Sequence, residues 1–274
     1  MVVIESAGLT DLGKKRQNNE DALFLDDDHR LYIVADGMGG HQAGEVASAM
    51  VIDTIRDFMT GVGGPSTAEE IGPHDETLSD AANRLVDGIR LANTGVYRLA
   101  TSDAAYKGMG STVAAAYFTD DTLIVANVGD SPIYLIHNGA IELLSVTHNV
   151  FTEQMAINPD LAKRIDNAYK RMLTRGMGIA ETVEPDTCEL QFFDNDMLVL
   201  SSDGLSDKVK PDEILDVASS SASAESACQQ LVDMANDRGG DDNITVIILK
   251  INTLKPKSDG FIGTLIRFLF PWKR

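Results

Sequence analysis

The stretch LYIVADGMGGHQAGE, Leu31–Glu45, decides how the rest of the chain is interpreted. A short apolar run ends abruptly in Asp36-Gly37, and the glycines that follow carry no side chains to crowd the carboxylate. A strand that stops at this point would present Asp36 at the open end of a sheet. Taken alone, the stretch is open to two interpretations: a turn that uses Asp and Gly only for its geometry, or a strand end that presents a functional carboxylate.

Acidic residues occupy the ends of predicted strands at four further places. They are Glu20-Asp21, Asp130 after Gly129, Asp203 after Ser202, and Asp241-Asp242. Carboxylates that converge at sheet edges repel one another unless cations hold them. Without a cluster of Cys or His, such a set favours hard ions such as Mg²⁺ or Mn²⁺. Two of these ions about 3.5–4 Å apart can clamp an in-line displacement at phosphorus.

An arginine accompanies the first acidic pair. Arg16 lies three residues before Asn19-Glu20-Asp21 and could offer a bidentate guanidinium to a phosphate dianion. A surface arginine without a ligand is the alternative interpretation of the same residue.

Hydrophobic periodicity predicts an α+β protein in which two antiparallel sheets are covered by helices. The short connections Thr119–Asp121 and Asn138-Gly139 indicate hairpins rather than parallel crossovers. The predicted strands lie at 2–7, 22–25, 113–118, 122–128, 133–137, 141–144, 187–192, 197–201 and 244–251, in addition to the run before Asp36. The predicted helices lie at 45–60, 78–100, 160–172, 211–218 and 224–237.

Composition narrows the function classes. The chain has 274 residues and a formal net charge of -19, which argues against a nucleic-acid partner because phosphate neutralisation needs clustered Lys and Arg. Its two cysteines provide neither a disulfide framework nor a cysteine-based zinc site. The N-terminal residues lack signal-peptide features, and no run of about 20 apolar residues exists. We therefore expect a cytoplasmic protein with one domain at residues 1–252 and a tail at 253–274.

Seven short motifs occur in an order that resembles the metal-dependent serine/threonine protein phosphatases of type 2C. The wording Asp-Gly-Met-Gly-Gly-His is similar to the bacterial branch of that family. The motifs are Arg16-x-x-Asn19-Glu20-Asp21, Val34-Ala-Asp36-Gly37-Met-Gly39-Gly40, Gly110-Ser111-Thr112, Gly129-Asp130-Ser131, Leu173-Thr-Arg-Gly-Met-Gly178, Ser202-Asp203-Gly204 and Asp242-Asn243-Ile-Thr.

The resemblance implies a four-layer α-β-β-α sandwich, two antiparallel sheets flanked by helix pairs, with a metal site at one end. It implies that Asp36 bridges two Mn²⁺ or Mg²⁺ ions and that the Gly37 carbonyl binds one of them. Asp203 and Asp242 would bind the second ion, and Asp130 would support a third, weaker one. Glu20 would bind directly or through water, Asp21 completes the acidic set, and Arg16 would bind the substrate phosphate.

The implied activity is hydrolysis of phosphoserine and phosphothreonine in proteins by a water that the two ions activate. The implied partners are phosphorylated proteins, including a serine/threonine kinase that the enzyme opposes or that kinase's substrates, and we expect a monomer. Two other interpretations stay open: a phosphatase-like module that binds a phosphoprotein without turning it over, and hydrolysis of small phosphoesters at the same site.

Several residues depart from the family pattern. Met38 stands where eukaryotic members carry a histidine assigned as general acid, and nearby His41 does not inherit that role. Pro132 replaces an arginine that often follows Gly-Asp-Ser. The usual Asp-His pair is not evident in Thr147–Val150, and residues 149–172, which correspond to a mobile flap, match poorly.

The tail has its own chemistry. Residues Phe261–Arg274 are apolar, aromatic and basic at the end, and are too short to span a bilayer. They suit an interfacial helix or a partner's groove. Packing against the domain and a tail without fixed structure are the alternatives.

Overall fold

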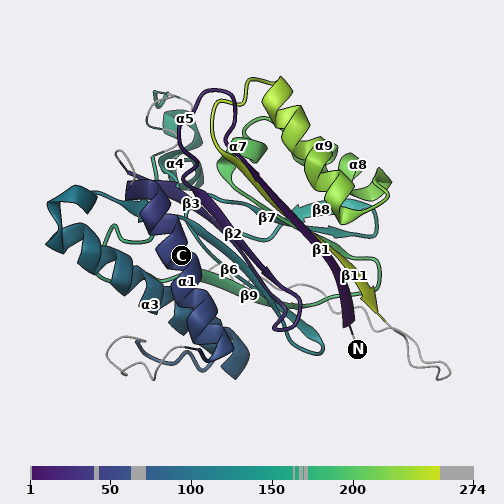
Figure 1. Cartoon of the computed structure of the whole chain (residues 1–274), viewed down its shortest axis with the longest axis horizontal. Helices are drawn as coiled ribbons and strands as arrows, with labels where there is room; N and C mark the ends of the chain where they lie inside the picture. Colours follow the sequence, from purple (N-terminus) through teal and green to yellow (C-terminus); the bar gives the residue numbers. More distant parts are fainter. Residues whose placement is uncertain are drawn as a thin grey trace.

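The computed structural model describes residues 2–39, 43–62, 72–162, 164–166, 169 and 172–253. Two antiparallel sheets lie between two groups of helices (Figure 1). No helix in these ranges is both long enough and apolar enough to cross a bilayer. The expected layered α+β fold is confirmed.

The first sheet has the strand order β1-β11-β10-β7-β8, and each neighbouring pair is antiparallel. The long pairing of β1 with β11 joins the two ends of the described chain. The strands are β1 (Val2–Asp11), β7 (Ile133–His137), β8 (Ala140–Leu143), β10 (Met197–Ser201) and β11 (Ile244–Thr253).

The second sheet has the order β2-β3-β5-β6-β9, with the two-residue strand β4 paired to the end of β3. The expected hairpins β5–β6 and β7–β8 are both present, the latter through Asn138 and Gly139 with φ of 50° and 75°. The strands are β2 (Asp21–Asp26), β3 (Leu31–Met38), β4 (Gly110–Ser111), β5 (Val113–Phe118), β6 (Thr122–Val128) and β9 (Asp186–Gln191).

Side-chain alternation on the strands produces three apolar layers. On β3, Tyr32 and Val34 face the other sheet, whereas Leu31, Ile33 and Ala35 face the helices. Each of these five residues is fully buried. A one-residue slip of β3 would exchange the two sets, so burial fixes its register.

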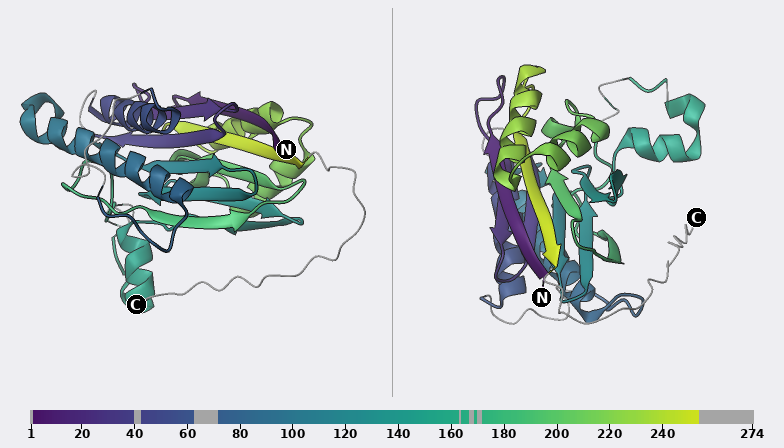
Figure 2. Two further views of the ribbon diagram at one scale, coloured as in Figure 1. Left: turned by 90° about the horizontal axis from the view of Figure 1, so that it is seen from below. Right: turned by 90° about the vertical axis from the view of Figure 1, so that its right-hand side faces the viewer.

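Helices α1 (Ala43–Thr60) and α3 (Asp80–Ser102) cover the outer face of the second sheet (Figure 2, left). Ser79 caps α3 by accepting a hydrogen bond from the Ala82 N–H. The short η1 (Ala104–Tyr106) follows α3 and leads to β4.

Helices α8 (Pro211–Ser220) and α9 (Ala224–Asp237) cover the first sheet. Proline opens α8 because its missing N–H would be unpaired in a first turn anyway. Ser223 caps α9 by accepting from the Ser226 N–H. The result is the α-β-β-α order that the family resemblance implies.

Two local expectations are wrong. The strand over Leu31–Met38 does not stop at Asp36, because Gly37 and Met38 continue it and pair with Ser111 and Gly110 of β4. The helix expected at 160–172 begins earlier within the described residues, as α4 (Val150–Ile157) and α5 (Pro159–Ala162).

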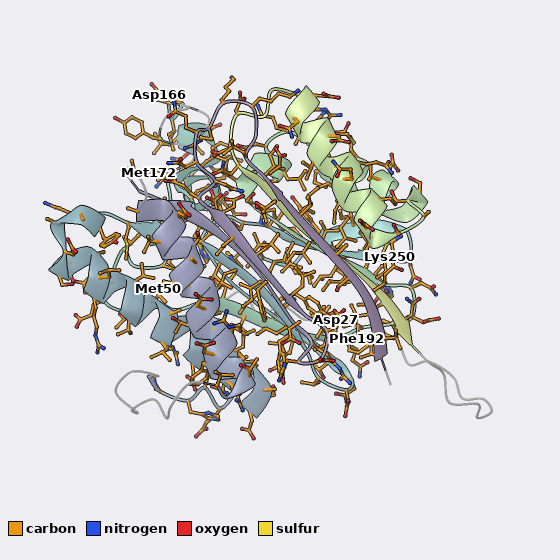
Figure 3. The ribbon with its side chains drawn as sticks, viewed as in Figure 1. Asp27, Met50, Asp166, Met172, Phe192 and Lys250 are labelled. Atoms are coloured by element: carbon orange, nitrogen blue, oxygen red, sulfur yellow. The ribbon has the colours of Figure 1, made fainter. Side chains whose placement is uncertain are left out.

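The second error has a local cause. Asn149 caps α4 by accepting from the Thr152 N–H, and Asn158 is extended because the following proline disfavours a helical residue before it. Pro159 then opens a new helix. Figure 2 (right) shows α4 and α5 projecting from one end of the sandwich, and Figure 3 places Asp166 and Met172 at this end, well away from Phe192.

The β1–β2 loop packs closely on the segment that enters β11. The Lys14 and Lys15 N–H groups both donate to the Gly240 carbonyl, at 2.8 and 3.2 Å. Gly13 has φ of +76°, and a Cβ there would lie 2.1 Å from the Asp242 carbonyl oxygen. Only glycine fits this contact.

Gly13→Ala should therefore destabilise the protein by more than Gly61→Ala. Gly61 has the same φ, +76°, but a Cβ there meets nothing within 4 Å. Gly61→Ala should cost about 1 kcal/mol from backbone strain alone, whereas Gly13→Ala adds a backbone clash. Urea unfolding of both variants measures the difference, and equal midpoints would contradict the close packing.

Candidate metal and phosphate site

Asp21 and Asp36 face each other at one end of the second sheet. They are paired residues in the antiparallel register of β2 and β3, and like charges at such positions repel. Burial and the negative charges of Asp21 and Asp203 raise the pKa of Asp36 well above its usual range. Burial, with Asp242 nearby, raises the pKa of Asp21 to about 6.

Three more of the predicted carboxylates belong to the same electrostatic group. Burial, with the charges of Asp130 and Asp207, raises the pKa of Asp203 to about 7. Burial also raises the pKa of Asp130, against a hydrogen bond with Asn149. Asp242 contributes negative charge to Asp21, Asp36 and Asp203 alike. The structure thus brings together acidic residues separated by more than two hundred positions.

Arg16 lies at the edge of this group. Its Nη2 donates to Asp242 Oδ2 at 2.7 Å, and its side chain is 48% exposed. The negative charges of Asp242, Glu20 and Asp36 all act on it. The guanidinium is therefore positioned between solvent and the carboxylates, where a bound phosphate could meet both.

The Glu20 backbone is fixed from three sides. Its N–H donates to Asn243 Oδ1 at 2.8 Å, and its carbonyl accepts from the Gly37 N–H and from Ser48 Oγ. Burial raises the pKa of its carboxyl, which Arg16 partly counteracts. A Cβ on Gly44 would lie 2.7 Å from Glu20 Cδ, so this glycine in α1 makes room for the side chain.

Several supporting residues carry no role in the sequence-based interpretation. Asn243 Nδ2 donates to the Leu12 and Asn18 carbonyls, which ties the β1–β2 loop to β11. Thr245 Oγ1 donates to Asp21 Oδ2 at 2.7 Å. Thr112 Oγ1 accepts from the Asp36 N–H at 3.0 Å. All three residues lie within the family motifs given above, and their place in those motifs is the only feature of the sequence that points to them.

His148 holds the turn that carries Asp130. The Gly129 N–H donates to His148 Nδ1 at 3.0 Å, so the proton of a neutral ring is on Nε2, which lies 2.6 Å from Asp186 Oδ2. Arg175 Nη1 donates to the same Asp186 oxygen. The family's usual Asp-His sequence pair is not evident in this chain, and His148 instead contacts Asp186 at the start of β9. Only the fold reveals this connection.

The other departures have structural consequences. The Cε of Met38 lies 2.7 and 2.9 Å from where a Cβ would stand on Gly110 and Gly176, so Met38 is a packing residue. The Pro132 carbonyl accepts from the Ser201 N–H. His41 lies outside the described residues, and so does part of the expected flap.

The donor set fits hard divalent cations. It consists of carboxyl groups and the Gly37 carbonyl. Burial, and after it the neighbouring negative charges, raise the pKa of several of these carboxyls, and bound cations would favour their ionised forms. Across the described ranges, no three Asp, Glu, His or Cys side chains already form a ready-made ion site. Asp242 instead pairs with Arg16, and an ion would have to draw it away.

Comparison with known proteins gives the family. The model of the family described as Protein phosphatase 2C matches residues 13–245. The chain belongs to this family. It is 34% identical over 244 residues to a putative protein phosphatase 2C-type of Streptococcus pyogenes, covering 88% of this chain and 94% of that protein. It is also 34% identical over 255 residues to the serine/threonine phosphatase stp of Listeria welshimeri, covering 91% and 97%.

Solved structures of the family share the fold. Stp1 from Staphylococcus aureus superposes with a TM-score of 0.77 at 31% identity, covering 92% of this chain and 96% of that one. The PstP catalytic domain in complex with two manganese ions gives 0.77 at 27% identity, covering 92% and 100%. The expected family and its enzyme class, a metal-dependent protein serine/threonine phosphatase, are confirmed.

Stability of the metal-free protein should fall as pH rises from about 5 to about 7. At Asp21, Asp36 and Asp203 the folded state holds a proton more tightly than the unfolded chain, so raising the pH removes protons that favour folding. Hydrogen bonds from Arg238 to Glu213, and from Lys15 and Lys208 to Asp241, lower the pKa of both carboxyls to about 2. These two groups add stability as the pH rises to about 5 and nothing further above it, so the decrease is measured between about pH 5 and 7. Thermal unfolding in EDTA should show Tm dropping by several degrees.

Two comparisons sharpen this measurement. Asp36→Asn removes one of the repelling charges and should flatten the pH dependence. Added Mn²⁺ should raise Tm more at pH 8 than at pH 5, because ligands bind in their deprotonated form. A Tm that rises steadily across this window in EDTA would contradict the electrostatic description.

Proposed function

We propose that this chain dephosphorylates phosphoserine and phosphothreonine in proteins at the acidic end of its sandwich, using two Mn²⁺ or Mg²⁺ ions. The observation that carries the proposal is the opposed pair Asp21–Asp36 in one electrostatic group with Asp203 and Asp242, beside Arg16. The manganese-bound PstP relative supports the choice of metal.

The proposed roles follow from position. Asp36, at the centre of the acidic group, would hold both ions, with the Gly37 carbonyl on one of them. Asp203 and Asp242 would hold the second ion. Glu20 and Asp21 complete the site, and Asp130, on the turn fixed by His148, would serve a third ion.

When bound, the ions would lower the pKa of a water molecule and neutralise phosphoryl oxygens. Arg16 would bind the remaining phosphate oxygens through a charge-assisted, bidentate contact. Its half-exposed position lets a phosphate on the surface of a protein reach it.

The alternative is a phosphatase-like module that binds phosphoproteins without turnover. Such a module would need Arg16 but not the six acidic residues of the site, because burial and repulsion disfavour the ionised forms of several of them. Retention of the full acidic set therefore supports the enzyme. Small phosphoesters would enter the same site and would report only its chemistry.

Asp36→Asn and Asp203→Asn should each lower phosphopeptide turnover by at least about 10³-fold, because each removes charge that holds an ion. Turnover of a phosphothreonine peptide with Mn²⁺, measured by phosphate release, tests this. EDTA should abolish the wild-type rate. Near-wild-type rates in both variants would exclude the proposed site.

Arg16→Ala provides a control with a different signature. It should mainly raise KM for the phosphopeptide, because the guanidinium binds phosphate in the ground state as well as in the transition state. An unchanged KM would leave Arg16 without the proposed role.

We also propose the finer expectations on domains and partners. Residues 1–252 would form the catalytic domain of a cytoplasmic monomer that opposes a serine/threonine kinase. The tail, 253–274, lies outside the described residues apart from Thr253. Its aromatic and basic composition supports a peripheral membrane contact, which would direct the enzyme to membrane-bound phosphoproteins.

Removal of residues 261–274 should reduce pelleting of the protein with anionic liposomes. Basic and aromatic residues bind such surfaces, whereas the acidic remainder is repelled by them. Neutral liposomes serve as the control. Equal pelleting of the full-length and truncated proteins would remove the membrane role and leave binding to a partner protein or packing on the domain.

A further inference from the structure

Three lysines gather at the rim of the site in an otherwise acidic chain. Lys14, Lys15 and Lys208, which we call the rim cluster, lie beside Asp241 and Asp237. The chain has 23 Lys and Arg against 42 Asp and Glu, so a cluster of ammonium groups is unusual for its composition. Lys15 directly precedes Arg16 in the chain, and Asp241, the partner of Lys15 and Lys208, directly precedes Asp242.

The backbone positions of the rim cluster are fixed. Lys14 and Lys15 donate their N–H groups to Gly240. Lys208 follows α7 (Asp203–Ser206), donates its N–H to the Leu205 carbonyl, and accepts at its own carbonyl from Arg238 Nη1 at 2.7 Å. Figure 1 shows the β1–β2 loop, α7 and the segment entering β11 at the same end of the molecule.

Two ammonium groups share one carboxylate. Lys15 and Lys208 both form ion pairs with Asp241, one through each of its oxygens. The Lys15 side chain is 66% exposed and that of Asp241 is 42% exposed. Two positive charges therefore meet one negative charge, and of the two ammonium groups that of Lys15 is the one open to solvent, since the Lys208 side chain is only 19% exposed.

The acidic group itself supplies the opposite charge, and Asp207, next to Lys208 in the chain, is part of it. Asp207 adds negative charge to Asp130 and Asp203, and no lysine or arginine is among the main charges acting on either of them. A peptide bound with its phosphate at Arg16 would therefore meet ammonium groups at the rim cluster and carboxyl groups at the acidic group. Such asymmetry discriminates among flanking sequences.

We propose that Lys15 and Lys208, with Lys14, select phosphoprotein segments that carry an acidic side chain on one side of the phosphorylated residue. The inference rests on the proposed function. Asp241 occupies the two ammonium groups in the free protein, and the acidic side chain of the substrate competes with it. The rim cluster therefore acts as a specificity site for an anionic flank.

The test uses phosphothreonine peptides that carry one glutamate, placed in turn at each position before or after the phosphothreonine. For each position, kcat/KM of the glutamate peptide is divided by kcat/KM of the same peptide with glutamine in its place, which gives a preference ratio. The wild-type protein should prefer glutamate on one side only, by about threefold, the size of one exposed ion pair. Raising the salt concentration to about 1 M, where the Debye length falls to about 3 Å, should abolish the preference.

Substitutions at Lys15 and at Asp241 should change this preference for glutamate over glutamine in opposite directions. Lys15→Glu should remove or invert the preference. Asp241→Asn frees both ammonium groups and should increase it. Lys107→Glu makes the same change in net charge at an exposed lysine away from Asp241 and should leave the ratio unchanged.

The outcomes are distinct. A glutamate-to-glutamine ratio of one at every position in the wild-type protein would overturn the specificity site, and so would equal effects of Lys15→Glu and Lys107→Glu. In both cases, normal turnover of the glutamine peptide would leave the proposed function in place. Absence of turnover for every peptide would overturn both. A preference that persists at high salt would exclude an electrostatic origin.

Discussion

The structure depends on a contact that is repulsive when both groups are ionised, the opposition of Asp21 and Asp36 across β2 and β3. Two carboxylates at paired positions disfavour the strand pairing that joins them. The pairing persists because neighbouring residues of β3 are fully buried on both faces, Tyr32 and Val34 inward and Ile33 outward. Each such side chain contributes about 1.5–3 kcal/mol by burial, so the apolar layers outweigh the repulsion and hold the charges in place.

The remaining carboxylates arrive at this end for topological reasons. In an antiparallel sheet, neighbouring strands run in opposite directions, so at each end of the sheet one strand begins where its neighbour ends. β2 begins there at Asp21, β10 ends there just before Asp203, and β11 begins there just after Asp242. The pairing of β1 with β11 brings the first loop onto the last, and Asn243 fixes that contact with hydrogen bonds to Leu12 and Asn18.

Sequence patterns predicted what depends on local chemistry. Asp-Gly after an apolar run located Asp36 and Asp203, and Asn138-Gly139 located a hairpin that the structure contains. Contacts across long sequence separations were not predictable in this way. Nothing near His148 indicates Asp186 as its partner, and the pairing of Gly37 and Met38 with β4 depends on a strand over seventy residues later. The helix expected at 160–172 was misplaced because the Asn149 cap and Pro159 fix where the helices of this segment begin.

The pair Arg16–Asp242 connects the two halves of the site. In the structure, Arg16 Nη2 donates a hydrogen bond to Asp242 Oδ2 at 2.7 Å, so the two side chains form an ion pair. In the proposed function, Asp242 turns to a cation and Arg16 to a phosphate, so both are drawn away from this ion pair. A cation near Asp242 lowers the cost of releasing Arg16, and a phosphate at Arg16 lowers the cost of releasing Asp242. By linkage the two ligands then favour each other's binding, to the same degree in both directions. In the proposed function, this one ion pair would thus couple the binding of metal to the binding of substrate.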